Sequence, residues 1–193
     1  MYTVGISRRT GCRFTGTDIN EQYLVRARYL AEQHGVSHLG KFVGSSWELM
    51  AAVVKEQKYT HVLSMGSLLY GHHIVDDILV DIAECCDTNT QVFIWDAIRK
   101  VDWKDCETVN KHLKMNNPLI SKEEMLKKIG SSRLELTDFE DFTTYVIPGY
   151  QVITRECQKR DPEMKVLTFP LLKDAFAEGT LGYVIYYLML AQG

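Results

Sequence analysis

Short apolar runs along the chain alternate with longer segments in which apolar residues recur at helical spacing. The run at residues 13–18 predicts a strand, and the segment after it predicts a helix that Asn20 can cap and Gly35 can end. The same alternation then predicts a strand at 41–44, a helix at 47–57, a strand at 60–65, a helix with Ile74, Ile78 and Ile82 in register, and a strand at 91–96. Repeated strand–helix units with short connections favour a parallel sheet covered by helices.

The C-terminal half departs from this alternation. Ser121 and Glu124 have the spacing of a capping box, and the helix that they open is expected to end at Gly130. The elements predicted after it are a strand at 134–142, an interrupted helical stretch at 150–177 and a strand at 182–190. The last two strands are expected to be antiparallel neighbours. The chain therefore reads as a single domain, 1–193, with a lid-like helical insertion at about 145–180.

Composition narrows the class of protein. The 193 residues are 46% hydrophobic and 24% charged, which is ordinary for a globular domain with a sizeable core. A net charge of −3 argues against a nucleic-acid partner and favours a small molecule or a protein. No membrane segment is expected, because the longest apolar run, 181–191, is shorter than the roughly 18 to 20 residues that span a bilayer.

Cysteines and acidic residues offer no metal site. The five cysteines have no C-x-x-C spacing, which argues against a disulfide framework or a zinc site and fits a cytoplasmic protein. Glu135, Asp138, Glu140 and Asp141 alternate along a predicted strand, and we interpret them as a solvated face without a bound cation.

The segment Thr10–Asn20 resembles the second strand and its exit in the class I S-adenosylmethionine (SAM) methyltransferases. Further segments resemble that family in the same order along nearly the whole chain: 44–47 the third-strand exit, 60–70 the fourth strand, 91–103 the fifth, and 181–187 the last strand of methyltransferases acting on sarcosine, phosphoethanolamine and related metabolites. The resemblance implies a Rossmann-like α/β sheet, mostly parallel with an antiparallel C-terminal strand.

The resemblance also implies SAM as cofactor and a set of residues around it. Asp18 matches the acidic residue that holds the ribose hydroxyls, and a carboxylate at the carboxyl edge of such a sheet suits that role. Ser46 stands where the family often has an aspartate that binds the adenine amino group, and Gly66 lies where it often has an acid. The expected cofactor-binding residues are Asp18, Ile19, Ser45, Ser46, Trp47, Ser64 and Met65.

Candidate catalytic residues follow the fourth strand. Tyr70, His72 and His73 could orient or deprotonate a nucleophile, and neutral imidazole accepts a proton near neutral pH. One of the histidines could instead simply flank the following helix. Asp96, expected to end the fifth strand, could bind an amine or cap a loop. Tyr145, Tyr150 and Tyr183 could line a lid or pack in the core.

One part of the family pattern is missing from the sequence. Residues 3–10 resemble the second half of the first helix, and neither Gly5 nor Gly11 can replace the Gly-x-Gly loop that follows the family's first strand. A missing central strand leaves two unpaired edges, with a cost of about 1 to 3 kcal/mol for each orphaned buried group. We therefore expect either closure of the gap, a homodimer, or a heteromeric partner that supplies the strand and loop.

Two functions fit these observations. The first is an enzyme that transfers the SAM methyl group to an N, O or C nucleophile of a small molecule, with a partner chain completing the cofactor site. The alternative is a non-methylating relative, which would be a regulatory or scaffold subunit of a complete methyltransferase, or a repurposed cyclase or isomerase. The missing loop, Ser46 and Gly66 are the departures that support the alternative.

Overall fold

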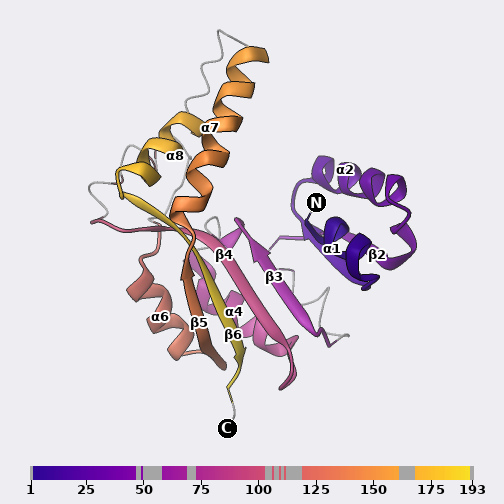
Figure 1. Cartoon of the computed structure of the whole chain (residues 1–193). Coiled ribbons are helices and arrows are strands. Elements are labelled where there is room, and N and C mark those ends of the chain that lie inside the picture. Colours follow the sequence, from indigo (N-terminus) through magenta and orange to yellow (C-terminus); the bar gives the residue numbers. More distant parts are fainter. Residues whose placement is uncertain are drawn as a thin grey trace. The chain divides into compact units, whose positions relative to one another are not determined.

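The computed structural model describes residues 2–46, 58–68, 73–102, 119–160 and 168–191, with the single positions 49, 106, 109 and 111. The chain divides into two compact units, Met1–Gln57 and Lys58–Gly193 (Figure 1). The helix predicted at 47–57 lies outside the described residues apart from position 49. That the two units act as one domain remains a prediction.

The first unit is a two-stranded parallel sheet with helices. Its elements are α1 (Tyr2–Thr10), β1 (Phe14–Asp18), α2 (Glu21–Gln33), the 3-10 turn η1 (Ser37–Leu39) and β2 (Gly40–Gly44). The two strands run parallel, as the sequence predicted, and the structure places Asp18 opposite Gly44. Asn20 caps α2, because its side chain accepts a hydrogen bond from the Gln22 N–H at 3.0 Å.

The core of this unit is small. Val4, Ala31 and Val36 are buried, and the rings of Phe14 and Phe42 meet edge to face at 5.3 Å. Gly40 makes this packing possible, since a Cβ there would lie 2.3 Å from the Phe14 ring. The N-terminal stretch is helical, as the resemblance implied.

The second unit contains a four-stranded mixed sheet. Its strands are β3 (His61–Met65), β4 (Gln91–Arg99), β5 (Leu134–Asp141) and β6 (Leu181–Leu190), in the spatial order β3-β4-β6-β5. β3 and β4 are parallel, whereas β6 is antiparallel to both β4 and β5. The predicted antiparallel pair at the end of the chain is confirmed.

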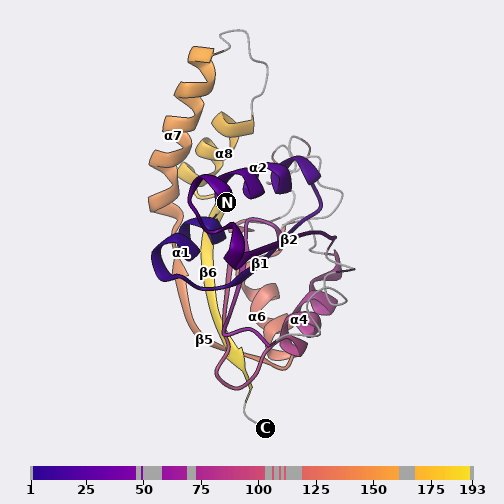
Figure 2. The same cartoon turned by 90° about the vertical axis from the view of Figure 1, so that its right-hand side faces the viewer.

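Helices α4 (Val75–Glu84) and α6 (Lys122–Gly130) lie on the same side of this sheet (Figure 2). Alternate strand residues such as Val92, Ile94 and Leu188 are buried, at 1% exposure or less. Their neighbours Phe93 and Trp95, which point to the opposite face, are only half-buried. The sheet therefore has one fully packed face and one aromatic face that is partly covered.

Two helices follow β5 along the chain and precede β6: α7 (Thr143–Arg160) and α8 (Thr168–Ala177). They pack together at one end of the sheet (Figure 1). The predicted start of the helical stretch at 150 is wrong. The helix begins at Thr143, and the Asp141 carboxylate, two residues before it, accepts a hydrogen bond from the Thr143 N–H at 2.9 Å. Pro148 lies inside α7.

The capping box of α6 should make stability depend on pH. Burial opposes ionisation of Glu124, but its bonds to Ser121 and the nearby Arg99 guanidinium hold the pKa of this carboxyl below its usual range. A lowered pKa stabilises the fold at pH values above about 4.3, the unfolded value, and this stabilisation is lost as the pH falls through the folded pKa.

We expect Glu124→Gln to reduce the free energy of unfolding by less than about 1 kcal/mol at pH 7, because the side chain is half-exposed. The difference between the two proteins should shrink toward zero at pH 3. Urea denaturation at pH 7 and pH 3 measures the difference in free energy of unfolding between the wild type and Glu124→Gln. A difference that does not change with pH would contradict a lowered pKa of Glu124.

Candidate functional site

Asp18 lies at the carboxyl end of β1, where a parallel sheet presents its ligand-binding edge. Its Oδ1 atom accepts a hydrogen bond from the Asn20 N–H at 2.8 Å, which fixes the orientation of the half-buried carboxylate. Within the part of the chain that the structure describes, Oδ2 has no hydrogen-bond partner. The carboxylate therefore supports the turn into α2 and still has acceptor capacity for a ligand.

Ile19 follows Asp18 and is 79% exposed, although it is a large apolar residue. It has no place in the small core of the first unit. An exposed aliphatic side chain beside an oriented carboxylate suits a ligand with hydroxyl groups and a flat apolar face.

The exit of β2 lies directly beside this carboxylate. The Ser45 N–H donates to the Asp18 carbonyl at 3.1 Å, and the Ser45 hydroxyl donates to the Ser46 carbonyl at 3.0 Å. The structure thus brings together four of the predicted cofactor residues, Asp18, Ile19, Ser45 and Ser46, at one edge of the first unit. Trp47 lies outside the described residues.

An ion pair near the same edge was missed by the sequence analysis. Glu21, in the first turn of α2, pairs with Arg28 at 2.6 Å. Its second carboxylate oxygen lies 3.5 Å from the position a Cβ on Gly44 would take. Because the two residues are seven positions apart, the helical spacing of i, i+3 or i+4 pairs gave no signal for this contact.

In the second unit, Ser64 and Met65 occupy the end of β3. Ser64 is buried, and its hydroxyl lies 3.3 Å from that of Ser67. The chain then turns at Gly66, whose φ of +64° lies in the left-handed region and whose N–H donates to the Trp95 carbonyl at 2.7 Å. A Cβ at Gly66 would lie 3.3 Å from the Tyr183 hydroxyl. Backbone conformation and crowding thus explain the glycine at a position where the family often has an acid.

We expect Gly66→Ala to lower the free energy of unfolding by about 1 to 2 kcal/mol, because a non-glycine residue is strained at positive φ. Gly130→Ala in α6 is the matched control, since its added Cβ meets nothing within 4 Å. Urea denaturation compares the two. Equal stability of both variants would show that the turn after β3 does not require glycine.

Aromatic side chains gather beside this turn. Trp95 contacts Tyr183 and Phe142, with ring centroids 5.6 and 6.1 Å apart. Phe176 of α8 packs edge to face on Tyr183 at 5.8 Å, and Tyr150 of α7 lies 5.3 Å from Phe176. We call these five residues the aromatic cluster. Most of the aromatic cluster is core packing between the sheet and helices α7 and α8. Tyr145, which is not part of the cluster, is 70% exposed and is available to a ligand.

The predicted catalytic residues are only partly visible. Tyr70 and His72 lie outside the described residues. His73 is exposed in the turn that precedes α4. Their role therefore stays a prediction.

Asp96 does not end its strand, which corrects the sequence-based prediction. β4 continues to Arg99, and Asp96 is 2% exposed on the fully packed face of the sheet. Its carboxylate accepts a hydrogen bond from the Ala97 N–H at 2.8 Å.

Cysteine and metal chemistry find no support in the described part of the chain. Burial, and then the adjacent Cys85, raise the pKa of Cys86 to about 11, so this thiol stays protonated. None of the five cysteines forms a disulfide bond. The described ranges hold no group of three metal-ligating side chains, and Glu135, Asp138, Glu140 and Asp141 are exposed along β5. No helix within these ranges is long and apolar enough to cross a membrane.

Several solved structures are similar to this chain. A protein from Galdieria sulphuraria, assigned as a sarcosine dimethylglycine methyltransferase, matches with a TM-score of 0.85 at 12% identity, covering 97% of this chain and 73% of its own. Geranyl diphosphate C-methyltransferase from Streptomyces coelicolor A3(2) matches with a TM-score of 0.77 at 13% identity, covering 98% and 66%. The [4+2]-cyclase SpnF matches with a TM-score of 0.73 at 14% identity, covering 99% and 71%.

No protein-family model and no curated protein sequence matches the chain. The structural likeness establishes the fold, which is that of the Rossmann-like class I methyltransferases.

Proposed function

We propose that this chain is a SAM-dependent methyltransferase that acts on an N, O or C nucleophile of a small molecule. The observation that carries the proposal is the edge formed by Asp18, Ile19 and Ser45. An oriented carboxylate with a free oxygen, an exposed apolar side chain and a strand exit lie together where this fold binds nucleotides.

These residues fit the nucleoside part of SAM. Asp18 would accept hydrogen bonds from the two ribose hydroxyls, because one of its oxygens is free and the other is held in place. Ile19 would pack on the adenine, and Ser45, Ser46 and Trp47 would border it. We assign Ser64 and Met65 to the cofactor as well, since they lie at a strand exit in the second unit.

The bound cofactor supplies a methyl group that its sulfonium charge already activates. The protein then mainly has to align the acceptor and exclude water. We propose that Tyr70, His72 and His73 orient the acceptor, and that a histidine takes up its proton where the acceptor has one to lose. Helices α7 and α8 would serve as a lid over the acceptor, with Tyr145 on its exposed side.

A partner chain that supplies another strand is part of this proposal. Among the described residues, β1 pairs only with β2 and β3 pairs only with β4, so each sheet has a terminal strand with one unpaired edge. Such edges readily take up a strand from another chain. A second copy of this chain or a heteromeric subunit could provide it, together with groups for the methionine end of SAM.

Calorimetric titration with S-adenosylhomocysteine, the demethylated product, tests the cofactor assignment. We expect saturable binding, either to the purified chain or to the complex in which it is isolated. No detectable binding to either at high micromolar ligand would refute a methyltransferase.

Native mass spectrometry with light scattering tests the partner. We expect a dimer or a complex with a second polypeptide. A monomer that binds S-adenosylhomocysteine and melts cooperatively would refute the partner while leaving the methyltransferase assignment intact.

The second candidate is a non-methylating relative, because the fold is shared with a [4+2]-cyclase and Ser46 and Gly66 replace acids that the family often has. Such a protein could be a cyclase, an isomerase or a regulatory subunit. Transfer of labelled methyl groups from SAM to a pool of small metabolites distinguishes the two: a labelled product supports the enzyme, and tight SAM binding without any product supports the relative.

A further inference from the structure

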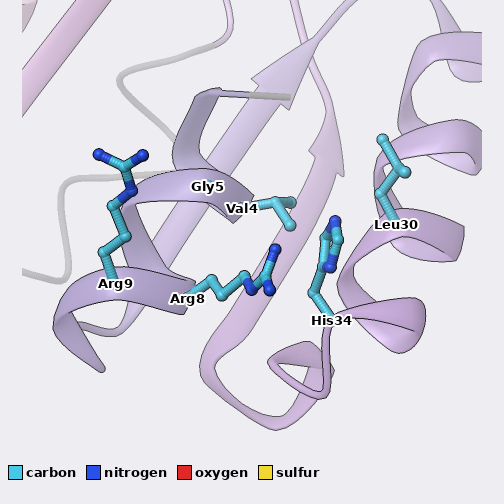
Figure 3. A pocket seen from close by; sticks show the side chains of 6 residues that line it. All are labelled: Val4, Gly5, Arg8, Arg9, Leu30 and His34. Atoms are coloured by element: carbon cyan, nitrogen blue, oxygen red, sulfur yellow. The ribbon is translucent and has the colours of Figure 1, made fainter.

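The first unit contains a groove of about 520 Å³ between α1 and the end of α2. Val4, Gly5, Arg8 and Arg9 line it from α1, and Leu30 and His34 line it from α2. Figure 3 shows the Arg8 side chain extending from α1 toward the His34 ring. In the same view, Val4 extends from α1 and Leu30 lies on α2. Its volume falls within the usual range of small-molecule sites, about 300 to 1,000 Å³.

The polar side chains that line this groove can donate hydrogen bonds, and no acidic residue lines it with them. Arg8, Arg9 and His34 form no ion pair or hydrogen bond through their side chains with any other described residue. Arg8 and Arg9 lie in the last turn of α1, where a positive charge suits the helix dipole. This preference explains their position on the helix. Arg8, Arg9 and His34 are all exposed, so their donor groups are accessible to an anion from solvent.

Gly5 leaves one wall of the groove open. Glycine is among the least favourable residues inside a helix, and Gly5 lies in the middle of α1. A Cβ at this position would meet nothing within 4 Å, in contrast to Gly40, where it would strike the Phe14 ring. Packing therefore does not require Gly5. Its effect is to leave the wall of the groove open.

The groove lies at the opposite edge of the unit from Asp18. Arg8 and His34 end the helices that lead to the starts of β1 and β2, whereas Asp18 and Ser45 follow their ends. Four residue steps along β1 separate these edges, which corresponds to about 13 Å. A ligand in the groove would therefore not be the cofactor that we assign to Asp18.

We propose that this groove binds a phosphate-bearing small molecule with an apolar body. A guanidinium group binds phosphate oxygens in a bidentate manner, and His34 adds a second donor from the other side. The half-buried Leu30 provides an apolar wall for the remainder of the ligand, and the open space at Gly5 admits it.

Calorimetry on the full chain with phenyl phosphate and inorganic phosphate tests this site. Phenyl phosphate should bind about tenfold more tightly than inorganic phosphate, because only its ring can use the apolar wall. Arg8→Gln and His34→Gln should each weaken phenyl phosphate binding about tenfold. Arg26→Gln is the matched control, since it removes the same charge from an exposed position of α2 outside the groove.

Gly5→Leu fills the groove without touching a charge. It should abolish phenyl phosphate binding while the melting temperature stays the same or rises, because leucine favours a helix more than glycine does. The absence of saturable binding to the wild-type chain up to about 10 mM ligand would overturn the proposal. So would an equal loss of affinity in Arg26→Gln and Arg8→Gln, or binding that survives in a folded Gly5→Leu protein.

Discussion

Asp18→Ala is expected to weaken the affinity for S-adenosylhomocysteine by about 10- to 150-fold. This range corresponds to the net loss of one charge-assisted hydrogen bond between the carboxylate and the ribose, about 1.5 to 3 kcal/mol. Asp18→Asn should have a smaller effect, since the amide oxygen can still accept from the Asn20 N–H and keep the turn into α2 intact. Calorimetric titration of the protein in the form that binds the ligand gives both affinities.

Glu32→Gln is the control for Asp18, because Glu32 is an exposed acid of the same unit on α2. Its affinity for S-adenosylhomocysteine should equal that of the wild type. If Asp18→Ala binds as tightly as this control, Asp18 only supports the helix and the cofactor site must be sought elsewhere.

Thr143→Ala is expected to reduce the free energy of unfolding of the second unit by about 1 to 3 kcal/mol. Thr143 is 6% exposed, and its hydroxyl oxygen accepts a hydrogen bond from the Tyr183 N–H at 3.0 Å. The same hydroxyl donates to the Asp141 carboxylate, which also pairs with Lys100 at 2.6 Å. Alanine would leave a buried N–H without its acceptor, and this is the costly kind of loss.

The variant Thr143→Ser distinguishes the contribution of the hydroxyl hydrogen bonds to stability from that of the packed methyl group. Serine keeps the hydroxyl and loses one methyl group, at a cost of no more than about 0.8 kcal/mol. Urea denaturation should therefore rank the wild type first, Thr143→Ser second and Thr143→Ala last. Equal stability of the two variants would show that the hydroxyl network at the start of α7 contributes nothing.

Sequence reasoning succeeded where neighbouring residues determine the structure. The Asn20 cap and the Ser121–Glu124 box depend on contacts within three positions, and both are confirmed. The adjacency of Asp18 and Ser45 could also be predicted, because parallel strands end at the same edge. The roles of these residues in binding remain predictions.

Sequence reasoning failed where tertiary contacts override a local signal. The helical stretch expected from residue 150 begins at Thr143 instead, where the Thr143 hydroxyl accepts a hydrogen bond from the N–H of Tyr183, 40 positions away along the chain. Asp96 suggested the end of a strand, yet it lies buried inside β4. The contact between Gly66 and Tyr183 joins residues that are far apart along the chain, so a single sequence contained no indication of it.

The small core of the first unit has a consequence for how ligands affect this protein. Among the described residues of this unit, the buried apolar side chains are Val4, Leu24, Ala27, Ala31 and Val36, and a core of this size gives a unit of fewer than about 60 residues modest stability by itself. Such a region opens by local unfolding more often than a well-packed sheet. Any molecule held by Asp18 or by the groove at Gly5 then stabilises the folded form by mass action. Occupancy by small molecules would thereby control the lifetime of this part of the protein as well as its chemistry.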